Sequence, residues 1–167
     1  MKKLLLFSLI LLLLLGIVGC GSTGSQADTY TVYYRRAVPT YGSTDSIIGE
    51  NHLLTSGRES DTAYLLRKYL ASTPENGFVS PFSQDITLVS FQQDGPTVKV
   101  VLSNQIAELS GMDLTIALAC LTRTIVSLTD CQEVIISANT AQLNGQNYIT
   151  LSRDSYLLID NSVQPKK

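Results

Sequence analysis

The sequence predicts an α+β sandwich in the order β-α-β-β-α-β, with two helices on one face of a mixed sheet. Three observations predict it. Apolar residues recur at helical spacing between residues 113 and 129, a β-branched run follows at 133–137, and two β-rich runs flank an Asp-Gly turn at 94–95. A helix with one apolar stripe must bury it against a sheet or another helix. The remaining elements are therefore expected to cover that stripe.

The first 19 residues are typical of an export signal. Lys2 and Lys3 precede an apolar run at 4–18, about 15 residues, which is short of the roughly 20 needed to span a bilayer. Residues 17–20, Ile-Val-Gly-Cys, match the bacterial lipobox, so we interpret 1–19 as a lipoprotein signal peptide and Cys20 as the lipidated residue. The alternative is an ordinary secretory signal with an incidental cysteine. The lipid, such as palmitate, would hold the protein at the extracytoplasmic face of the cell membrane.

Residues 20–28 would then form a lipidated cysteine and a flexible Gly/Ser tether. Removing Lys2 and Lys3 from the 12 basic residues leaves 10 against 14 acidic ones, a net charge near −4. Nucleic-acid binding depends on basic surface stripes, so this negative net charge predicts no nucleic-acid partner. Binding to anionic lipid through surface charge is disfavoured for the same reason.

The folded domain is expected over 29–160. Residues 30–36 are rich in β-formers and predict the first strand. A long polar loop would follow, with at most a short strand at 53–54, and then a helix over 59–72 with Ser60 as its N-cap. Pro74 and Gly77 would end that helix. A structured loop at 78–85 leads to strands at 86–91 and 97–102 around Asp94-Gly95.

The second half centres on the helix at 113–129. Its stripe comprises Leu114, Leu118, Leu121, Ile125 and Leu128, with Ala117 on one flank. Thr115, Thr122 and Arg123 lie off the stripe and are expected to face water. After the strand at 133–137 come a tight turn at 143–146 and possible strands at 148–151 and 156–159. Residues 161–167 are expected to be a disordered tail.

The pattern from about Tyr30 to Thr140 resembles a GerMN domain, the sporulation and spore-germination module of bacterial lipoproteins. The resemblance is carried by Tyr33-Tyr34, the helix end at 65–70, the proline loop at 78–82, the Asp94-Gly95 hairpin, the strand at 100–103, and the helix end at 125–129 that runs into 134–136. It implies an extracytoplasmic interaction module, similar to the ring-building motifs that associate side by side. The family has no catalytic residues to transfer. It commonly pairs two such domains, whereas this chain has room for one.

Few residues suggest chemistry. His52 is the only histidine, which excludes a two-histidine metal site, and it is expected to be an exposed loop residue. Cys120 and Cys131 would lie roughly 15 Å apart along the helix axis, too far for a disulfide, and are expected to be buried thiols. Most aspartates fall at turns and helix ends. We therefore predict no catalytic site, no metal and no cofactor.

The tyrosines leave two interpretations open. The sequence has eight tyrosines and no tryptophan, and Tyr30, Tyr33, Tyr34 and Tyr41 cluster near the first strand. They could form a protein or glycan contact surface, or they could line the sheet interior. The favoured function is a membrane-anchored, non-catalytic domain that contacts itself or another envelope protein through a sheet edge or helix face. The alternative is a lipoprotein that binds a small ligand or cell-wall glycan, and a hydrolase is a third.

Overall fold

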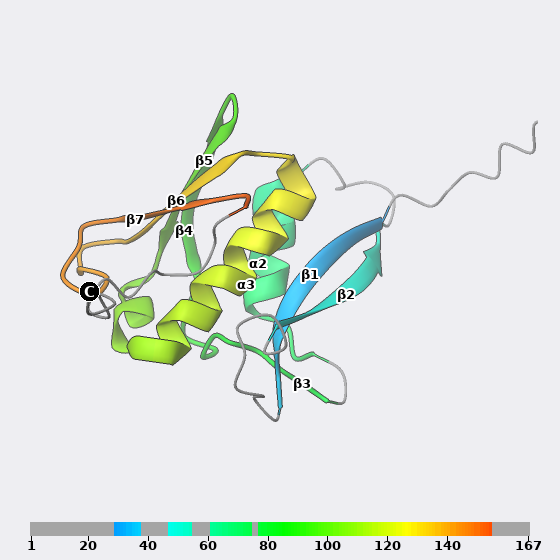
Figure 1. Ribbon diagram of the computed structural model, residues 1–167, viewed down its shortest axis with the longest axis horizontal. Coiled ribbons are helices and arrows are strands. Elements are labelled where there is room, and N and C mark those ends of the chain that lie inside the picture. The colour runs from blue at the N-terminus through cyan, green and yellow to red at the C-terminus, as the bar shows by residue number, and fades with distance from the viewer. Residues whose placement is uncertain (1–28, 38–46, 55–60, 75–76, 155–167) are drawn as a thin grey trace, which may run out of the picture.

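A computed structural model describes residues 29–37, 47–54, 61–74 and 77–154 of the chain. Two sheets, two α-helices and a short 3₁₀ helix make up this part (Figure 1). In chain order, the elements are β1 (Thr29–Arg36), β2 (Ile47–Leu53), α2 (Thr62–Leu70), β3 (Phe78–Val79), β4 (Leu88–Asp94), β5 (Thr97–Leu102), η1 (Asn104–Glu108), α3 (Gly111–Thr129), β6 (Glu133–Ala138) and β7 (Ile149–Ser152). The predicted α+β class is confirmed.

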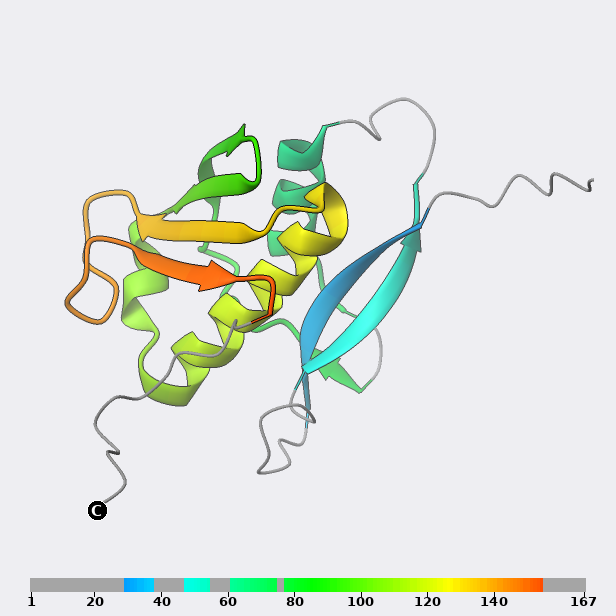
Figure 2. The ribbon, with the colours of Figure 1, turned by 45° about the horizontal axis from the view of Figure 1, so that its top comes forward.

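Helix α3 lies at the centre of the molecule, with one sheet on either side of it (Figures 1 and 2). One face of the helix joins the main hydrophobic core with residues of α2, of β1 and of strands β4 to β7. Its buried residues there are Leu114, Ala117, Leu118, Leu121 and Ile125. A second face buries Ile116, Ala119 and Cys120 against Ile47 and Tyr33 of the first sheet. The helix therefore buries two faces where the sequence predicted one stripe.

The larger sheet has the strand order β4-β5-β6-β7. Strands β4 and β5 form the predicted hairpin, and Gly95 supplies the positive φ, 56°, at its turn. Strands β5 and β6 are parallel, so the chain must cross over between them, and η1 with α3 is that crossover. This βαβ unit lays α3 on the sheet. The predicted turn at 143–146 is also present, with Asn144 and Gly145 at positive φ.

The smaller sheet has the order β2-β1-β3 and is antiparallel throughout. It corrects two predictions. Strand β2 covers seven residues, Ile47–Leu53, where the sequence predicted a loop with a short strand at 53–54. Strand β3 lies within the region predicted to be a loop. Both errors have one cause: these segments are polar or short, and their β conformation comes from pairing with β1 rather than from local propensity.

Other boundaries differ by a few residues. Helix α2 begins at Thr62, and its N-cap is Asp61, whose side chain accepts a hydrogen bond from the Tyr64 N–H at 3.0 Å. The predicted N-cap, Ser60, lies outside the described residues, as do the expected strand at 156–159, the signal peptide, the tether and the tail. Strand β4 runs over 88–94 instead of 86–91, and β7 over 149–152.

Helix α3 has the length and composition of a membrane-spanning helix, but it is the core helix of this domain and more than half of it is buried. Thr122, which was expected to face water, is fully buried, because the second packed face of α3 extends around the helix. Arg123 lies over the ring of Tyr33 instead of pointing away from the protein, with 4.2 Å from Cζ to the ring centroid.

Candidate functional site

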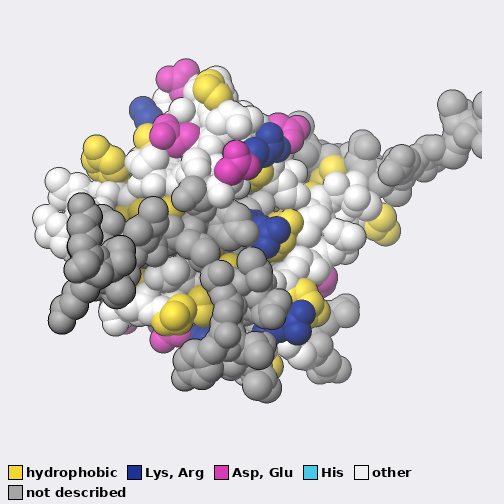
Figure 3. Space-filling model, viewed as in Figure 1, with side chains coloured by type: hydrophobic (Ala, Val, Ile, Leu, Met, Phe, Trp, Pro, Cys, Tyr) yellow, Lys and Arg dark blue, Asp and Glu magenta, His cyan; other side chains and the backbone are white. Residues whose placement is uncertain are grey.

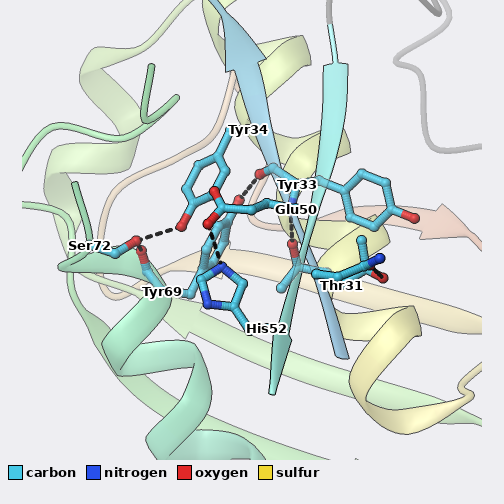
Figure 4. A network of polar contacts seen from close by, with 9 residues as sticks. Thr31, Tyr33, Tyr34, Glu50, His52, Tyr69 and Ser72 are labelled. Carbon is cyan, nitrogen blue, oxygen red and sulfur yellow. Dashed lines mark hydrogen bonds and ion pairs between the residues drawn. The ribbon is translucent and has the colours of Figure 1, made fainter. Parts of the chain in front are cut away.

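The face of β1 and β2 that turns toward α2 carries a network of polar contacts (Figure 4). The register pairs Tyr30 with His52 and Val32 with Glu50, so these side chains share one face. The Tyr30 and His52 rings stack with centroids 5.5 Å apart. His52 Nε2 lies 3.1 Å from Glu50 Oε1, which is ion-pair distance, although the two groups are not aligned for a hydrogen bond. Glu50 Oε2 is buried without a hydrogen-bond partner.

Deeper in this face, tyrosine hydroxyls join the sheet to α2. The Tyr34 hydroxyl lies 2.8 Å from Ser72 Oγ, and the Tyr69 hydroxyl donates to the Tyr33 carbonyl. Burial raises the pKa of Tyr34 and raises that of Tyr69 further. Both hydroxyls are therefore neutral at physiological pH and serve as structural hydrogen-bonding groups. Nothing in this geometry activates a nucleophile.

Helix α3 closes the other edge of β1. The Thr31 N–H donates to Ser127 Oγ at 2.9 Å, and the Tyr33 N–H donates to Thr124 Oγ1 at 3.0 Å. Side-chain hydroxyls of a helix thus take the place of a neighbouring strand along this edge. Buried backbone donors need such partners, and this arrangement fixes β1 against the C-terminal half of α3.

A shallow hollow of about 310 Å³ opens beside this contact. Its wall includes the Tyr33 ring with the Arg123 guanidinium over it, and Arg153, whose Nη2 lies 3.0 Å from Asp130 Oδ1. The Thr122 hydroxyl is buried there without a hydrogen-bond partner. The remaining lining residues are Val126 and Ser127. Aromatic, guanidinium and hydroxyl groups together can hold a small polar ligand through stacking and hydrogen bonds.

The structure separates the four tyrosines of the candidate surface. Tyr30 and Tyr34 are 6% and 2% exposed, so of the two interpretations left open, the one in which they line the sheet interior applies to these two. Their alternation along β1 turns both toward α2. Tyr33, on the opposite face, is half-buried at the hollow. Tyr41 and Cys20 lie outside the described residues.

His52 was expected to be an exposed loop residue, and this is wrong, because it lies on β2 and stacks on Tyr30. Sequence reasoning also missed Glu50, Arg123 and Arg153. For Glu50, the sequence did contain a signal: the spacing Glu50-x-His52 places both side chains on one face of a strand. No signal in the sequence connects Arg123 with Tyr33, because 90 residues separate them.

Metal-ligating side chains do not gather in the part of the chain that the structure describes: it has no group of three His, Cys, Asp or Glu side chains that could hold an ion. Cys120 and Cys131 are both free and buried, as predicted. Burial raises the pKa of the Cys120 thiol to about 12. That thiol is therefore protonated and inert at neutral pH.

Comparisons with known proteins identify the fold. Neither a family model nor a curated protein sequence matches the chain. Among solved structures, the first GerMN domain of the sporulation protein GerM from Bacillus subtilis superposes with a TM-score of 0.58 and 17% identity, over 77% of this chain and 99% of that one. The tandem GerMN domains of the same protein give 0.54 and 20%, over 72% of this chain. This chain spans 43% of the tandem structure. The fold is thus GerMN-like.

Proposed function

We propose, from the fold that this domain shares with GerMN domains, that the protein is a membrane-anchored, non-catalytic interaction module on the extracytoplasmic face of the cell membrane. Cys20 carries the lipid, and the domain beyond the tether contacts other copies of itself or another envelope protein. The sequence resemblance adds sporulation or germination as the setting.

This proposal is supported by the edge strands: in the described part of the chain, each sheet ends in a strand that has no neighbouring strand on one side. Strand β2 has β1 on one side only, and β4 has β5 on one side only. Most side chains of β4 are exposed, including Val89 at 48%. Unpaired edges present rows of N–H and C=O groups to another chain.

The surface charge also suits a protein partner better than a polyanion. On the face shown in Figure 3, acidic and basic side chains of the described residues are interspersed, without a stripe of either sign. Such a surface gives little attraction to nucleic acid.

Two measurements test the proposal. The intact protein should fractionate with membranes and incorporate labelled palmitate, whereas Cys20→Ser should do neither. The soluble domain, residues 29–160, should then be analysed by size-exclusion chromatography with light scattering, together with pull-down from solubilised membranes. We expect a higher-order species or a captured envelope protein. A strict monomer that captures nothing would overturn the interaction role, and wild-type protein that stays soluble would overturn the anchor.

The hollow at Tyr33 supports a second function, the binding of a small polar ligand or a cell-wall glycan fragment. Thermal-shift measurements against muropeptides and small solutes would test this function. Tyr33→Ala should abolish any shift, because it removes the ring over which Arg123 lies. Tyr148→Ala is the matched control, since Tyr148 is 59% exposed and does not line the hollow. If neither muropeptides nor solutes shift the wild-type transition, this second function fails.

A further inference from the structure

Hydrogen bonds along β1 determine which backbone groups of β2 face outward. The N–H groups of Thr31 and Tyr33 point to α3, away from β2. In an antiparallel pair, both polar groups of a residue point to the same side, and this side alternates along the strand. The backbone groups of Tyr30, Val32 and Tyr34 therefore point to β2, where their partners are His52, Glu50 and Ile48. It follows that Gly49, Asn51 and Leu53 present their N–H and C=O groups at the open edge.

Nothing in the described part of the chain covers this edge. Strand β2 is the outermost strand of its sheet, and Figures 1 and 2 show no described segment alongside it. Natural edge strands are often protected by lysine or proline. The sequence of β2, Ile-Ile-Gly-Glu-Asn-His-Leu, contains neither.

The order of residues in β2 is complementary to itself when reversed about Asn51. Two copies that pair antiparallel around this residue would place Glu50 opposite His52 of the other copy, and Gly49 opposite Leu53. They would also place Ile48 opposite Leu54. Leu53 is 64% exposed, and Gly49 carries no side chain, although the Thr31 and Tyr33 side chains lie over its Cα. In this register the Glu50 carboxylate thus faces an imidazole and Ile48 faces another apolar side chain, and such cross-strand pairs are the unit of stabilisation in a sheet.

Three other nearby registers also pair outward-facing groups, and each is worse. One centred on His52 puts two imidazoles opposite each other and Glu50 opposite the apolar Leu54. A register centred on Glu50 puts two carboxylates directly opposite each other, which is destabilising. One centred on Gly49 puts Glu50 opposite the apolar Ile48. A charge in an edge strand usually prevents pairing, and here the same charge discriminates between registers.

We propose that β2 is a homodimer interface, in which two copies of this chain join their three-stranded sheets through antiparallel β2 strands centred on Asn51. The outward groups of Gly49, Asn51 and Leu53 would form about six backbone hydrogen bonds across the twofold axis. The inference rests on the proposed interaction function and specifies its partner as a second copy.

Disulfide trapping tests the register. In the full-length protein in membranes, Asn51→Cys places two thiols at the twofold axis, with Cα atoms about 5.5 Å apart, within the disulfide range of about 4.4–6.8 Å. Mild oxidation should convert most of this variant to a covalent dimer. Leu53→Cys is the matched control, because it is an exposed position on the same face of β2. The two thiols would lie about 14 Å apart and should not cross-link.

A dimer band for Asn51→Cys without one for Leu53→Cys supports the interface. No dimer for Asn51→Cys, or equal dimer for both variants, overturns it. As a second readout, Asn51→Pro removes an outward N–H at an edge position where proline is tolerated. The dimer fraction of this variant should be at least tenfold lower than that of the wild type. If Asn51→Cys fails while wild-type protein still associates or captures a partner, the β2 interface is wrong and the interaction function stands. If the wild-type protein is a monomer and captures no partner, both the β2 interface and the interaction function are wrong.

Discussion

At the scale of single residues, two hydroxyls of α3 decide how the first sheet is attached. Thr124 Oγ1 accepts from the Tyr33 N–H at 3.0 Å, and Thr124 is fully buried. Thr124→Val keeps the shape and removes the acceptor, so the backbone donor is left unpaired. We expect the free energy of unfolding to fall by about 1–3 kcal/mol, measured by urea denaturation followed by circular dichroism.

Thr115→Val is the control for that substitution. The Thr115 hydroxyl donates to the Gly111 carbonyl within α3 and reaches no other element. Its replacement by valine should therefore change the stability by well under the effect at Thr124. Equal losses at the two positions would show that the hydroxyl bridge to β1 contributes nothing specific.

The buried thiol of Cys120 predicts a response to alkaline pH. Its pKa in the folded protein is raised to about 12, above the unfolded value near 8.5. The stability that comes from the neutral thiol is fully present below the unfolded pKa and is lost as the pH rises toward 12. Cys120→Ala should therefore lose less stability than wild type between pH 7 and pH 11, measured as the change in urea midpoint. Identical losses would contradict this.

The wrong expectation for Thr122 shows where residue-level prediction ends. Helical spacing correctly assigned Leu114, Leu118, Leu121 and Ile125 to the core. Periodicity locates a stripe relative to one partner, and α3 has two. The second face consists of Ile116, Ala119 and Cys120, small or isolated apolar residues among threonines, so its pattern is weak. Only the position of the first sheet shows that it is buried.

At the scale of elements, α2 depends on its first turn. Asp61 accepts from the Tyr64 N–H, and no acidic residue lies in the first turn after it. Asp61→Ala should destabilise the domain by about 1 kcal/mol, because the Tyr64 N–H in the first turn of the helix loses this acceptor. Asp61→Asn retains a capping oxygen, so its loss of stability should be at most about half that of Asp61→Ala. Thermal unfolding of the three proteins compares them, and an alanine variant as stable as wild type would exclude the cap.

The elements predicted well are those whose signals are local. Strand β5 matches its predicted range of 97–102, because β-branched residues follow an Asp-Gly turn. Strand β2 could not be predicted in the same way. Its central residues, Gly49 to His52, have low strand propensity, and its conformation comes from pairing with residues 12 to 24 positions earlier in the chain. The polar network of Glu50 and His52 was missed for the same reason.

At the scale of the whole molecule, α3 joins two sheets of unequal attachment. The main core with α3 and α2 takes buried residues from all four strands of the larger sheet, whereas the first sheet contributes Tyr30, Val32 and Tyr34 of β1 to it. The second face of α3 buries Ile47 of β2. Regions with fewer buried contacts open at lower free energy. We expect amide hydrogens of β2 to exchange faster than those of β5 and β6 in the native protein.

Two core substitutions of similar size separate the two attachments. Ile116→Ala removes apolar volume between α3 and the first sheet, so it should lower protection in β1 and β2 and leave β5 and β6 nearly unchanged. Leu118 lies in the main core, so Leu118→Ala should lower the free energy of global unfolding by about 2–5 kcal/mol. Amide protection should therefore fall in both sheets. Hydrogen exchange followed by mass spectrometry resolves the two patterns. If Ile116→Ala destabilises both sheets equally, the domain unfolds as one cooperative unit. The first sheet would then not move independently of α3 when β2 binds a partner.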